Sequence, residues 1–370
     1  MDGELTNSAG PNRLFIAGSN DQYLAQIEQA VHSFYEPQSF TDSHELMDVL
    51  YSKTPSALVL DSALPGMPGV DVISKIRGLI GGDAMPIIFT IAAGRQDVIE
   101  AANKFPGVVC LEKPYKRSDL LNVIADQING FVEAKWEKIE PVQRNALKKT
   151  LGSFTAIADT LINGEELDYG VVKDNCVDLV RAVQSNNFKE ILQGVKEHHN
   201  YTYAHSMRVA TLLSLFGDAI GITGEDHMTL TTGGLLHDVG KMSIPHEILN
   251  KKGKLDDEER LLMNDHVLFT TQFLERSTTV PKGAMVIAGQ HHEKLDGTGY
   301  PNGFAGPQVN KLARMACIID IFSALTDERS YKAAMSPEKA FGIMEDMGGY
   351  HLDKLLLKTF KDMLLSGVLH

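Results

Sequence analysis

Short apolar segments alternate with helix-like segments through the first third of the chain, and this alternation constrains the fold more than any other feature. The apolar segments cover residues 13–17, 57–60, 86–90 and 108–111. Helix-like stretches, such as residues 22–32 and 70–79, lie between them. Strands that alternate with helices form a parallel sheet covered on both faces. We therefore predict a first domain over residues 11–129 with an α/β doubly wound parallel sheet.

The rest of the chain has a helical pattern. A length of 370 residues is enough for two domains, or for two domains and a connector. Residues 130–195 are amphipathic with polar interruptions, which is typical of a helical connector that packs on itself or on a second subunit in a homodimer. Residues 196–370 combine helical segments with Gly/Pro-rich turns and contain most of the 13 histidines. We predict a multidomain protein with a helical C-terminal domain.

Composition excludes several classes of protein. The formal net charge of −13 argues against a duplex nucleic-acid surface, because phosphate binding requires an excess of Lys and Arg. No apolar segment approaches the ~18 residues of a membrane helix, and residues 1–11 lack a hydrophobic signal core. We therefore predict a cytoplasmic protein without a membrane partner. Cys110, Cys176 and Cys317 lie far apart, which indicates free buried thiols rather than disulfides.

Histidine and aspartate side chains of the C-terminal part offer the chemistry of a metal centre. Imidazole and carboxylate groups bind divalent transition metals, and a carboxylate can bridge two ions. Two ions about 3.5–4 Å apart can activate a water and stabilise the leaving oxygen of a phosphodiester. A single histidine on an apolar helix face is more often a core residue, but several such positions in one domain favour metal binding. The candidate ligands are His205, His237, Asp238, His266, His291, His292 and Asp320.

The order of the surrounding motifs is specific. In sequence they are His205 with residues 208–210, residues 237–241, 244–245 and 253–255, His266, residues 291–293 and 296–303, Arg314, Asp320 and residues 329–332. This series resembles the HD-GYP phosphodiesterases, a branch of the HD superfamily, over about residues 196–345. The resemblance implies an all-α HD-GYP domain, which we assign to residues 196–370, with a non-haem centre that is often iron or manganese. It also implies hydrolysis of cyclic di-GMP to linear pGpG, and sometimes on to GMP.

The resemblance also implies roles for individual residues. His205, His237, Asp238 and Asp320 would hold one metal ion, and Asp238 would bridge to a second ion held by His266, His291 and His292. Asp238 and Lys241 are the implied catalytic residues, with Lys241 touching a phosphate oxygen. The implied substrate contacts are Lys241, Tyr300, Arg329 and Lys332. Residue patterns alone leave Tyr300 as part of a plain surface loop, Arg329 and Lys332 as solvated charges, and Arg314 in a structural salt bridge.

Two positions depart from the family pattern. Tyr201 stands one helical turn before His205, where some members have a glutamate that helps to hold a third metal. A phenol is a poor ligand at neutral pH, so we predict two divalent ions. Ser323 stands three residues after Asp320, where the family often has an aspartate. This change brings substrate preference or rate into question but leaves the candidate ligands intact.

The first domain resembles a two-component receiver. Asp61 ends a predicted buried strand, Thr90 ends the next, and Lys113 ends the last. They match the phospho-acceptor aspartate, the switch threonine and the lysine of receivers, at the sheet edge where ligands usually bind. The acidic pair that holds Mg²⁺ in receivers is replaced by Gly18 and Ser19. We predict a degenerate receiver that docks or dimerises and is phosphorylated poorly or not at all.

Three interpretations of function follow. The leading one is a two-metal phosphodiesterase for cyclic di-GMP attached to a receiver-like domain. The second is a catalytically weak cyclic-dinucleotide sensor or a module that recruits a partner. The third is a hydrolase of another dinucleotide, linear or hybrid. The resemblance implies a GGDEF-type or other signalling protein as a partner of the Gly-Tyr-Pro loop, and a histidine kinase as a partner of the receiver.

Overall fold

The chain divides into two compact units, Met1–Ala134 and Lys135–His370. The computed structural model describes residues 13–31, 35–79, 82, 85–196, 198, 200–249, 251, 253–327, 334–347 and 350–365. Among these residues, no helix is both long enough and apolar enough to cross a membrane.

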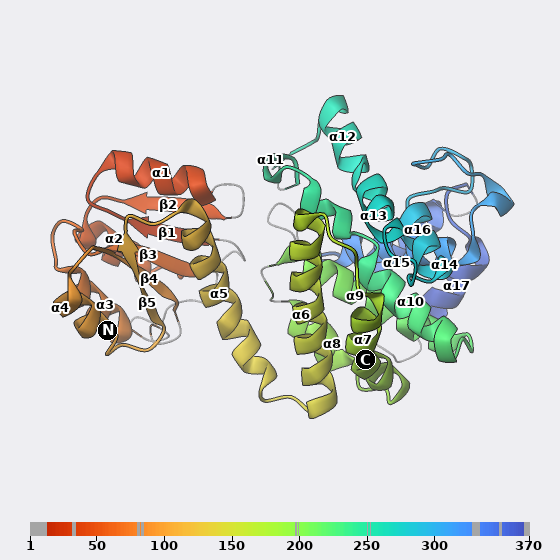
Figure 1. Ribbon diagram of the computed structural model, residues 1–370, viewed down its shortest axis with the longest axis horizontal. Helices are drawn as coiled ribbons and strands as arrows, with labels where there is room; N and C mark the ends of the chain where they lie inside the picture. The colour runs from red at the N-terminus through yellow and green to blue at the C-terminus, as the bar shows by residue number, and fades with distance from the viewer. Residues whose placement is uncertain are drawn as a thin grey trace. The chain divides into compact units, whose positions relative to one another are not determined.

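The first unit is a five-stranded sheet in the order β2-β1-β3-β4-β5, and all neighbouring strands are parallel (Figure 1). The strands are β1 (Arg13–Ala17), β2 (Glu36–Phe40), β3 (Ala57–Asp61), β4 (Ile87–Ala92) and β5 (Val108–Lys113). The helices are α1 (Asp21–Val31), α2 (Ser43–Leu50), α3 (Gly69–Arg77), α4 (Gln96–Ala102) and α5 (Arg117–Trp136), whose last two residues belong to the second unit. The predicted doubly wound fold is confirmed. The segment of β2 was not identified as a strand from the sequence, because an edge strand with the residues EPQSF is mostly polar.

Successive residues of the central strands point to opposite faces of the sheet, and each face has its own core. Phe15 and Leu58 pack with α2, α3 and α4 on one face. Ile16 and Val59 pack with α1 and α5 on the other. Every residue of β3 is buried, as expected for a strand covered on both faces. Asp61 and Thr90 are paired at the carboxyl ends of β3 and β4.

The described part of the second unit is helical apart from an isolated β-bridge between Asp296 and Ala305 (Figure 1). Its first helices are α6 (Pro141–Asn163), α7 (Tyr169–Gln184), α8 (Lys189–Lys196), α9 (Tyr201–Ala219) and α10 (Gly224–Leu236). The 3-10 helix η2 (Val239–Ser243), α11 (His246–Leu249), α12 (Asp257–Asn264), α13 (His266–Glu275) and α14 (Lys282–Gln290) follow. The chain continues through η3 (Gly306–Gln308), α15 (Lys311–Thr326), α16 (Pro337–Asp346) and α17 (Lys354–Met363).

Helices within residues 130–195 pack against the histidine-bearing helices of the second unit. Helix α7 contacts α9 and α10, and the hydroxyl of Tyr169 lies 3.0 Å from that of Thr232. The hydroxyl of Tyr203 donates to the carbonyl oxygen of Leu147 in α6 at 3.0 Å. These helices are therefore part of the packing that holds α9 and α10. The expected boundaries at residues 129 and 195 stay predictions.

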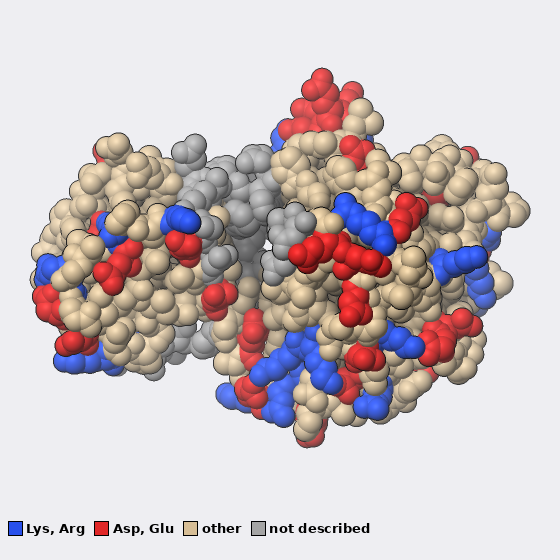
Figure 2. All heavy atoms as spheres, viewed as in Figure 1, with Lys and Arg blue, Asp and Glu red and all other residues tan. Residues whose placement is uncertain are grey.

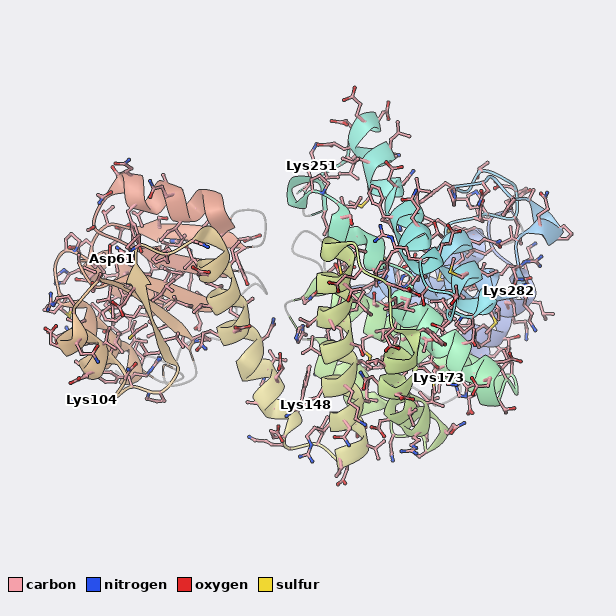
Figure 3. The ribbon with its side chains drawn as sticks, in the orientation of Figure 1. Asp61, Lys104, Lys148, Lys173, Lys251 and Lys282 are labelled. Atoms are coloured by element: carbon pink, nitrogen blue, oxygen red, sulfur yellow. The ribbon has the colours of Figure 1, made fainter. Side chains whose placement is uncertain are left out.

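Charged side chains of both signs are scattered over the face of the second unit that Figure 2 shows. The projecting tip is the acidic first turn of α12, formed by Asp257, Glu258 and Glu259. Asp61 lies at the carboxyl end of β3 in the first unit, whereas Lys148 and Lys173 lie on α6 and α7 (Figure 3). Both lysines form ion pairs, with Glu137 and Glu225 respectively.

Candidate functional site

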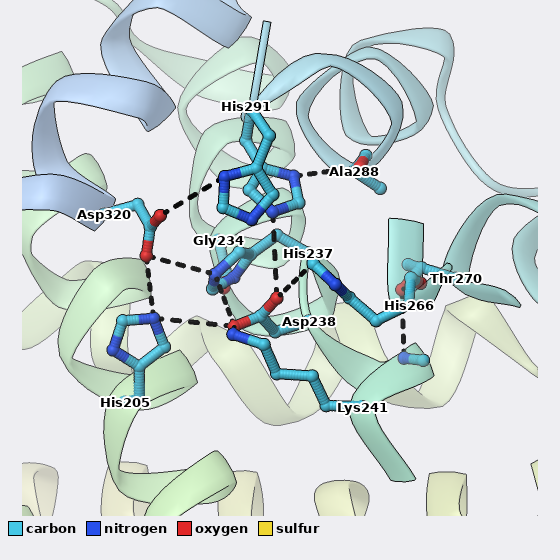
Figure 4. A network of polar contacts seen from close by, with 12 residues as sticks. His205, Gly234, His237, Asp238, Lys241, His266, Thr270, Ala288, His291 and Asp320 are labelled. Carbon is cyan, nitrogen blue, oxygen red and sulfur yellow. Dashed lines mark hydrogen bonds and ion pairs between the residues drawn. The ribbon is translucent and has the colours of Figure 1, made fainter. Parts of the chain in front are cut away.

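Five helical elements bring the seven candidate ligands into one cluster (Figure 4). His205 comes from the second turn of α9, and His237 and Asp238 follow the end of α10. His266 begins α13, His291 and His292 follow α14, and Asp320 lies on α15. We call these seven residues the His/Asp cluster. Residues up to 115 positions apart are in contact, as His205 and Asp320 are.

Asp238 joins two halves of the His/Asp cluster. One half is Asp238 with His266, His291 and His292, and the other is Asp238 with His205 and His237; within each half the ligand atoms lie within 4.8 Å of one another. Oδ2 of Asp238 is 3.5 Å from Nε2 of His205 and 3.3 Å from Nε2 of His237. Oδ1 is 3.2 Å from Nε2 of His266 and 3.7 Å from Nε2 of His291. Each carboxylate oxygen of Asp238 therefore faces a different pair of imidazoles.

Backbone carbonyls determine which ring nitrogen faces the cluster. Nδ1 lies 2.7 Å from the Gly234 oxygen in His237, 2.6 Å from the Met263 oxygen in His266 and 2.9 Å from the Ala288 oxygen in His291. Since a carbonyl only accepts, each Nδ1 carries the hydrogen and each Nε2 keeps its lone pair. These three Nε2 atoms and Oδ1 of Asp238 are buried, and none has a hydrogen-bond partner in the part of the chain that the structure describes. A cation is the partner that converging lone pairs share, so the donor set fits a metal ion.

A close approach of two segments aligns Asp238 with His266. A Cβ atom on Gly240 would lie 2.2 Å from the carbonyl oxygen of His266, so only glycine fits where η2 meets α13. The backbone N–H of Gly240 donates to Oγ1 of Thr270 at 2.9 Å, and Thr270 in turn donates to the His266 carbonyl at 2.8 Å. Thr270 thus links the backbone next to Asp238 with the backbone of His266.

Burial and neighbouring charges set the protonation of the cluster. Burial lowers the pKa of His237 and His266, and lowers that of His292 strongly. A neutral imidazole is the form that binds metal. Burial by itself raises the pKa of Asp238, but electrostatic interaction with the adjacent His237 ring and the Lys241 ammonium holds it well below its ordinary value. Asp238 is therefore ionised and available as a ligand.

His205 differs from the other imidazoles. Burial opposes its charge, but the hydrogen bond with Asp320 and the nearby carboxylate of Asp327 raise the pKa of His205 to about 9. Its Nε2 lies 2.9 Å from Oδ1 of Asp320, and its Nδ1 lies 3.6 Å from Oδ2 of Asp327. A metal ion at this Nε2 would displace the proton of that nitrogen. Asp327 was not among the residues that the sequence singled out.

Asp61, Thr90 and Lys113, the three residues expected at the receiver site, also lie close together, at the carboxyl ends of the strands. Nζ of Lys113 is 2.8 Å from Oδ2 of Asp61, and the backbone N–H of Ala63 donates to Oδ1 at 3.1 Å. The hydroxyl of Thr90 is 2.6 Å from that of Tyr23, whose ring lies 3.9 Å below Nζ of Lys113. The sequence did not single out Tyr23, because helical periodicity alone does not show that α1 directs this side chain toward the carboxyl ends of the strands.

Comparison with known proteins agrees with this division. The response regulator receiver domain model matches residues 17–125, and the HD domain model matches residues 188–356. The chain carries a receiver domain followed by an HD domain. The predicted pairing of a receiver-like domain with a domain of the HD superfamily is confirmed.

Several characterised proteins are similar to part or most of the chain. The 3'3'-cGAMP-specific phosphodiesterase 3 of Vibrio cholerae is 42% identical over 146 residues, which are 40% of this chain and 32% of that protein. The cyclic di-GMP phosphodiesterase response regulator RpfG of Xanthomonas campestris is 27% identical over 84% of this chain and 75% of its own length. A solved HDGYP protein from Bdellovibrio bacteriovorus has 22% identity and a TM-score of 0.49, and the match covers 67% of this chain and 81% of that one. The chain thus spans about a third of the first relative's length and three quarters of the second's.

Four residues mark the open side of the cluster in the HD domain. The side chains of Lys241, His292 and Asp320 are 20%, 24% and 11% exposed, and Tyr201 is 37% exposed. By contrast, His237, Asp238, His266 and His291 are at most 1% exposed. Nζ of Lys241 contacts Oδ2 of Asp238, so a positive charge already reaches the cluster. We call the exposed side the mouth of the site.

The Gly-Tyr-Pro loop lies against the cluster. Tyr300 stacks on His292, with ring centroids 4.7 Å apart and an interplanar angle of 24°. The backbone N–H of Tyr300 donates to the His292 carbonyl oxygen at 3.2 Å. Glu293 is buried and accepts from the backbone N–H groups of Asn302 at 2.7 Å and Phe304 at 3.0 Å. Glu293 belongs to the motif of residues 291–293, where the sequence suggested no role for it, and its contacts show that it holds this loop.

Other predicted residues have plainer surroundings. Arg314 pairs with Asp353 at 3.2 Å and donates to backbone carbonyls, as a structural salt bridge does. Ser323 is fully buried, and its hydroxyl has no hydrogen-bond partner among the described residues. Arg329 and Lys332 lie outside the described residues.

Proposed function

We propose that the HD domain is a metal-dependent phosphodiesterase that hydrolyses a cyclic dinucleotide. One observation carries this proposal: a buried aspartate lies between two sets of imidazoles, and the Nε2 lone pairs of His237, His266 and His291 converge on its two oxygens without a hydrogen-bond partner among the described residues. That arrangement provides for two divalent ions that share Asp238, one in each half of the cluster. We propose Fe²⁺ or Mn²⁺ as the ions, because sites with both imidazole and carboxylate ligands suit such metals.

The proposed ligands divide between the two halves. His205, His237 and Asp320 would serve the ion on the Oδ2 side of Asp238, and His266, His291 and His292 the ion on the Oδ1 side. When bound, two such ions supply an activated water and charge stabilisation for an in-line displacement at phosphorus. Asp238 fixes the spacing of the two halves. Lys241, at the mouth, would turn from Asp238 to a phosphate oxygen of the substrate and bind it through charge.

The substrate class follows from the relatives, whose names give cyclic di-GMP or 3'3'-cGAMP as what they act on. We propose cyclic di-GMP as the substrate and linear pGpG as the first product. A site of two cations and Lys241 attracts a phosphodiester even in a chain of net charge −13, because local charge decides binding in a confined site. Tyr300, next to His292, is the proposed substrate contact of the Gly-Tyr-Pro loop.

The test is turnover of cyclic di-GMP by protein purified without oxygen and supplied with Fe²⁺ or Mn²⁺, with metal counted in the same sample. We expect linear product and about two ions per chain, and loss of both in His237→Ala. The matched control is His227→Gln, because His227 is also buried in α10 but bonds to Ser214 outside the cluster. Full metal occupancy without turnover of cyclic di-GMP would contradict the proposal. Hydrolysis of a linear or hybrid dinucleotide in that case would move the assignment to that substrate, and binding without hydrolysis would make the protein a sensor.

We further propose that the receiver domain works without phosphorylation of Asp61. The hydroxyl of Tyr23 forms a hydrogen bond with the Thr90 hydroxyl, and the Tyr23 ring lies under the Lys113 ammonium. Thr90 and Lys113, which would contact a phosphoryl group on Asp61, therefore already contact Tyr23. A Cβ atom on Gly18 would lie 2.5 Å from Cδ1 of Tyr23, so the Tyr23 ring lies where a side chain at position 18 would begin. Incubation with acetyl phosphate and Mg²⁺ should give no Asp61-dependent gain in mass. A stoichiometric gain would overturn this proposal and would favour a histidine kinase as partner.

A further inference from the structure

Two tyrosines stack on histidines from opposite halves of the His/Asp cluster. Tyr201 lies on His205, with ring centroids 5.9 Å apart and planes inclined by 16°. Tyr300 lies on His292 at 4.7 Å and 24°. His205 belongs to the half on the Oδ2 side of Asp238, and His292 to the half on the Oδ1 side. The cluster therefore has one aromatic ring on each half.

Asp320 links the two stacked pairs. Its Oδ1 lies 2.9 Å from Nε2 of His205, and its Oδ2 lies 4.0 Å from Nδ1 of His292. The order of groups is thus Tyr201, His205, Asp320, His292 and Tyr300. Tyr201, Asp320 and His292 all retain exposed surface, while the ligands beneath them are closed to solvent. This array lies along the mouth of the site.

Local geometry holds Tyr201 in place. It is the first residue of α9, four positions before His205, and residues four apart lie on the same face of a helix. The preceding residue, Asn200, caps the helix by accepting from the backbone N–H of Tyr203 at 3.0 Å. The ring of Tyr201 therefore stacks on His205, and the residue is 37% exposed, so it is not a core residue.

We propose that Tyr201 is a base-stacking residue, on which one nucleobase of the cyclic dinucleotide lies while a phosphodiester meets the cluster at Asp320 and Lys241. The inference rests on the proposed function and names the subsite that this chain adds to it. A cyclic dinucleotide has a base on each side of its two phosphodiesters, and the array has a tyrosine on each side of Asp320. Stacking tolerates any base because every base has a π-face. Tyr201 would thus favour dinucleotides over phosphate esters without a base.

The test compares Tyr201→Leu and Tyr201→Phe with the unaltered full-length chain, and Tyr51→Leu serves as control because Tyr51 is also an exposed tyrosine, in the receiver domain. The probe is cyclic di-GMP with one guanine replaced by 2-aminopurine, mixed rapidly with metal-loaded protein and followed by fluorescence before turnover. Metal per chain is counted for each variant, and kcat and KM are measured with cyclic di-GMP.

We expect Tyr201→Leu to bind the probe roughly 5- to 140-fold more weakly, the range that stacking of one base on an aromatic side chain gives. Fluorescence quenching should decrease and KM should rise, while metal content and kcat change little. Tyr201→Phe should behave as the unaltered chain. Unchanged affinity and quenching in Tyr201→Leu would overturn the inference, as would a loss of metal that explains the weaker binding. If the unaltered chain neither binds nor hydrolyses the dinucleotide, the proposed function fails as well.

Discussion

Asp61 and Asp238 are both buried carboxylates in this chain, yet the groups around them differ in kind. Asp61, in the receiver domain, meets the ammonium of Lys113, a backbone N–H and the hydroxyl of Ser19. Asp238, in the HD domain, contacts Lys241 through Oδ2, but its Oδ1 faces the Nε2 atoms of His266 and His291, which have no hydrogen to donate. The first site is satisfied by the protein's own groups, whereas the second is a donor set that fits a cation.

This difference explains how the buried carboxylate of one site has its partners within the protein while Oδ1 of the other has no hydrogen-bond partner among the described residues. Desolvation of a carboxylate is offset only when the charge finds donors or an opposite charge. In the receiver domain Lys113 provides that charge, and Tyr23 engages Thr90. In the HD domain the backbone carbonyls turn the imidazole lone pairs inward, so protein groups alone leave the buried acceptors without partners.

The largest expected effect is that of Asp238→Asn, which removes the charge shared by both halves of the cluster and keeps the shape. Loss of a partner outside the ligand set typically costs about 10–100-fold in metal affinity or activity, so we expect a larger loss for this shared ligand. Metal analysis and cyclic di-GMP turnover measure it, with Asp226→Asn, on the exposed start of α10, as control. Two ions per chain in Asp238→Asn would refute the role of Asp238.

Removal of metal should separate the two domains in a thermal melt. A metal at 100 times its Kd stabilises the folded state by about 2.7 kcal/mol, which corresponds to roughly 5–10 °C for a domain of this size. Chelation should lower the transition of the HD domain by that amount and leave the receiver transition in place. Calorimetry with and without chelator, followed by Mn²⁺ addition, provides the measurement. A shift of both transitions, or of neither, would remove the contrast between the sites.

Opening the Asp61 site should make the two sites more alike. The double variant Gly18→Asp, Tyr23→Ala removes the ring from Thr90 and Lys113 and adds a carboxylate where receivers hold Mg²⁺. We expect Mg²⁺ to bind the receiver domain at millimolar concentration. We also expect acetyl phosphate to add the mass of one phosphoryl group. Asp61→Asn in the same background is the control. A variant that folds but gains no mass would show that more than Tyr23 closes the site.

The smallest expected effect is that of Tyr23→Phe, which keeps the ring and deletes one hydroxyl. The buried hydroxyl of Thr90 then loses its 2.6 Å partner, at a cost of about 1 kcal/mol in the free energy of unfolding. Urea unfolding of the receiver transition measures it, and Tyr51→Phe, at an exposed site, should change it little. A neutral result for Tyr23→Phe would mean that Thr90 needs no partner from α1.

Sequence periodicity was enough for the doubly wound sheet and the helical second unit, because both are local patterns of buried side chains. Strand β2 was not predicted because an edge strand needs few apolar residues. The pattern of residues 130–195 did not indicate that their helices pack against α9 and α10. The types of the candidate ligands could be read from the sequence, since imidazole and carboxylate are the groups that bind such metals. Their number and order also sufficed to predict a metal centre.

Only the tertiary structure decided how those groups face one another. The sequence names His237, His266 and His291, but the carbonyl partners of each Nδ1 exist only once the helix ends are formed. Tyr23 on Thr90, Asp327 beside His205 and Tyr201 over the mouth likewise depend on contacts between separate elements. The sequence determined which chemistry is present, because side-chain type is local. The structure decided which groups are satisfied and which remain open, because hydrogen-bond direction depends on how distant segments approach.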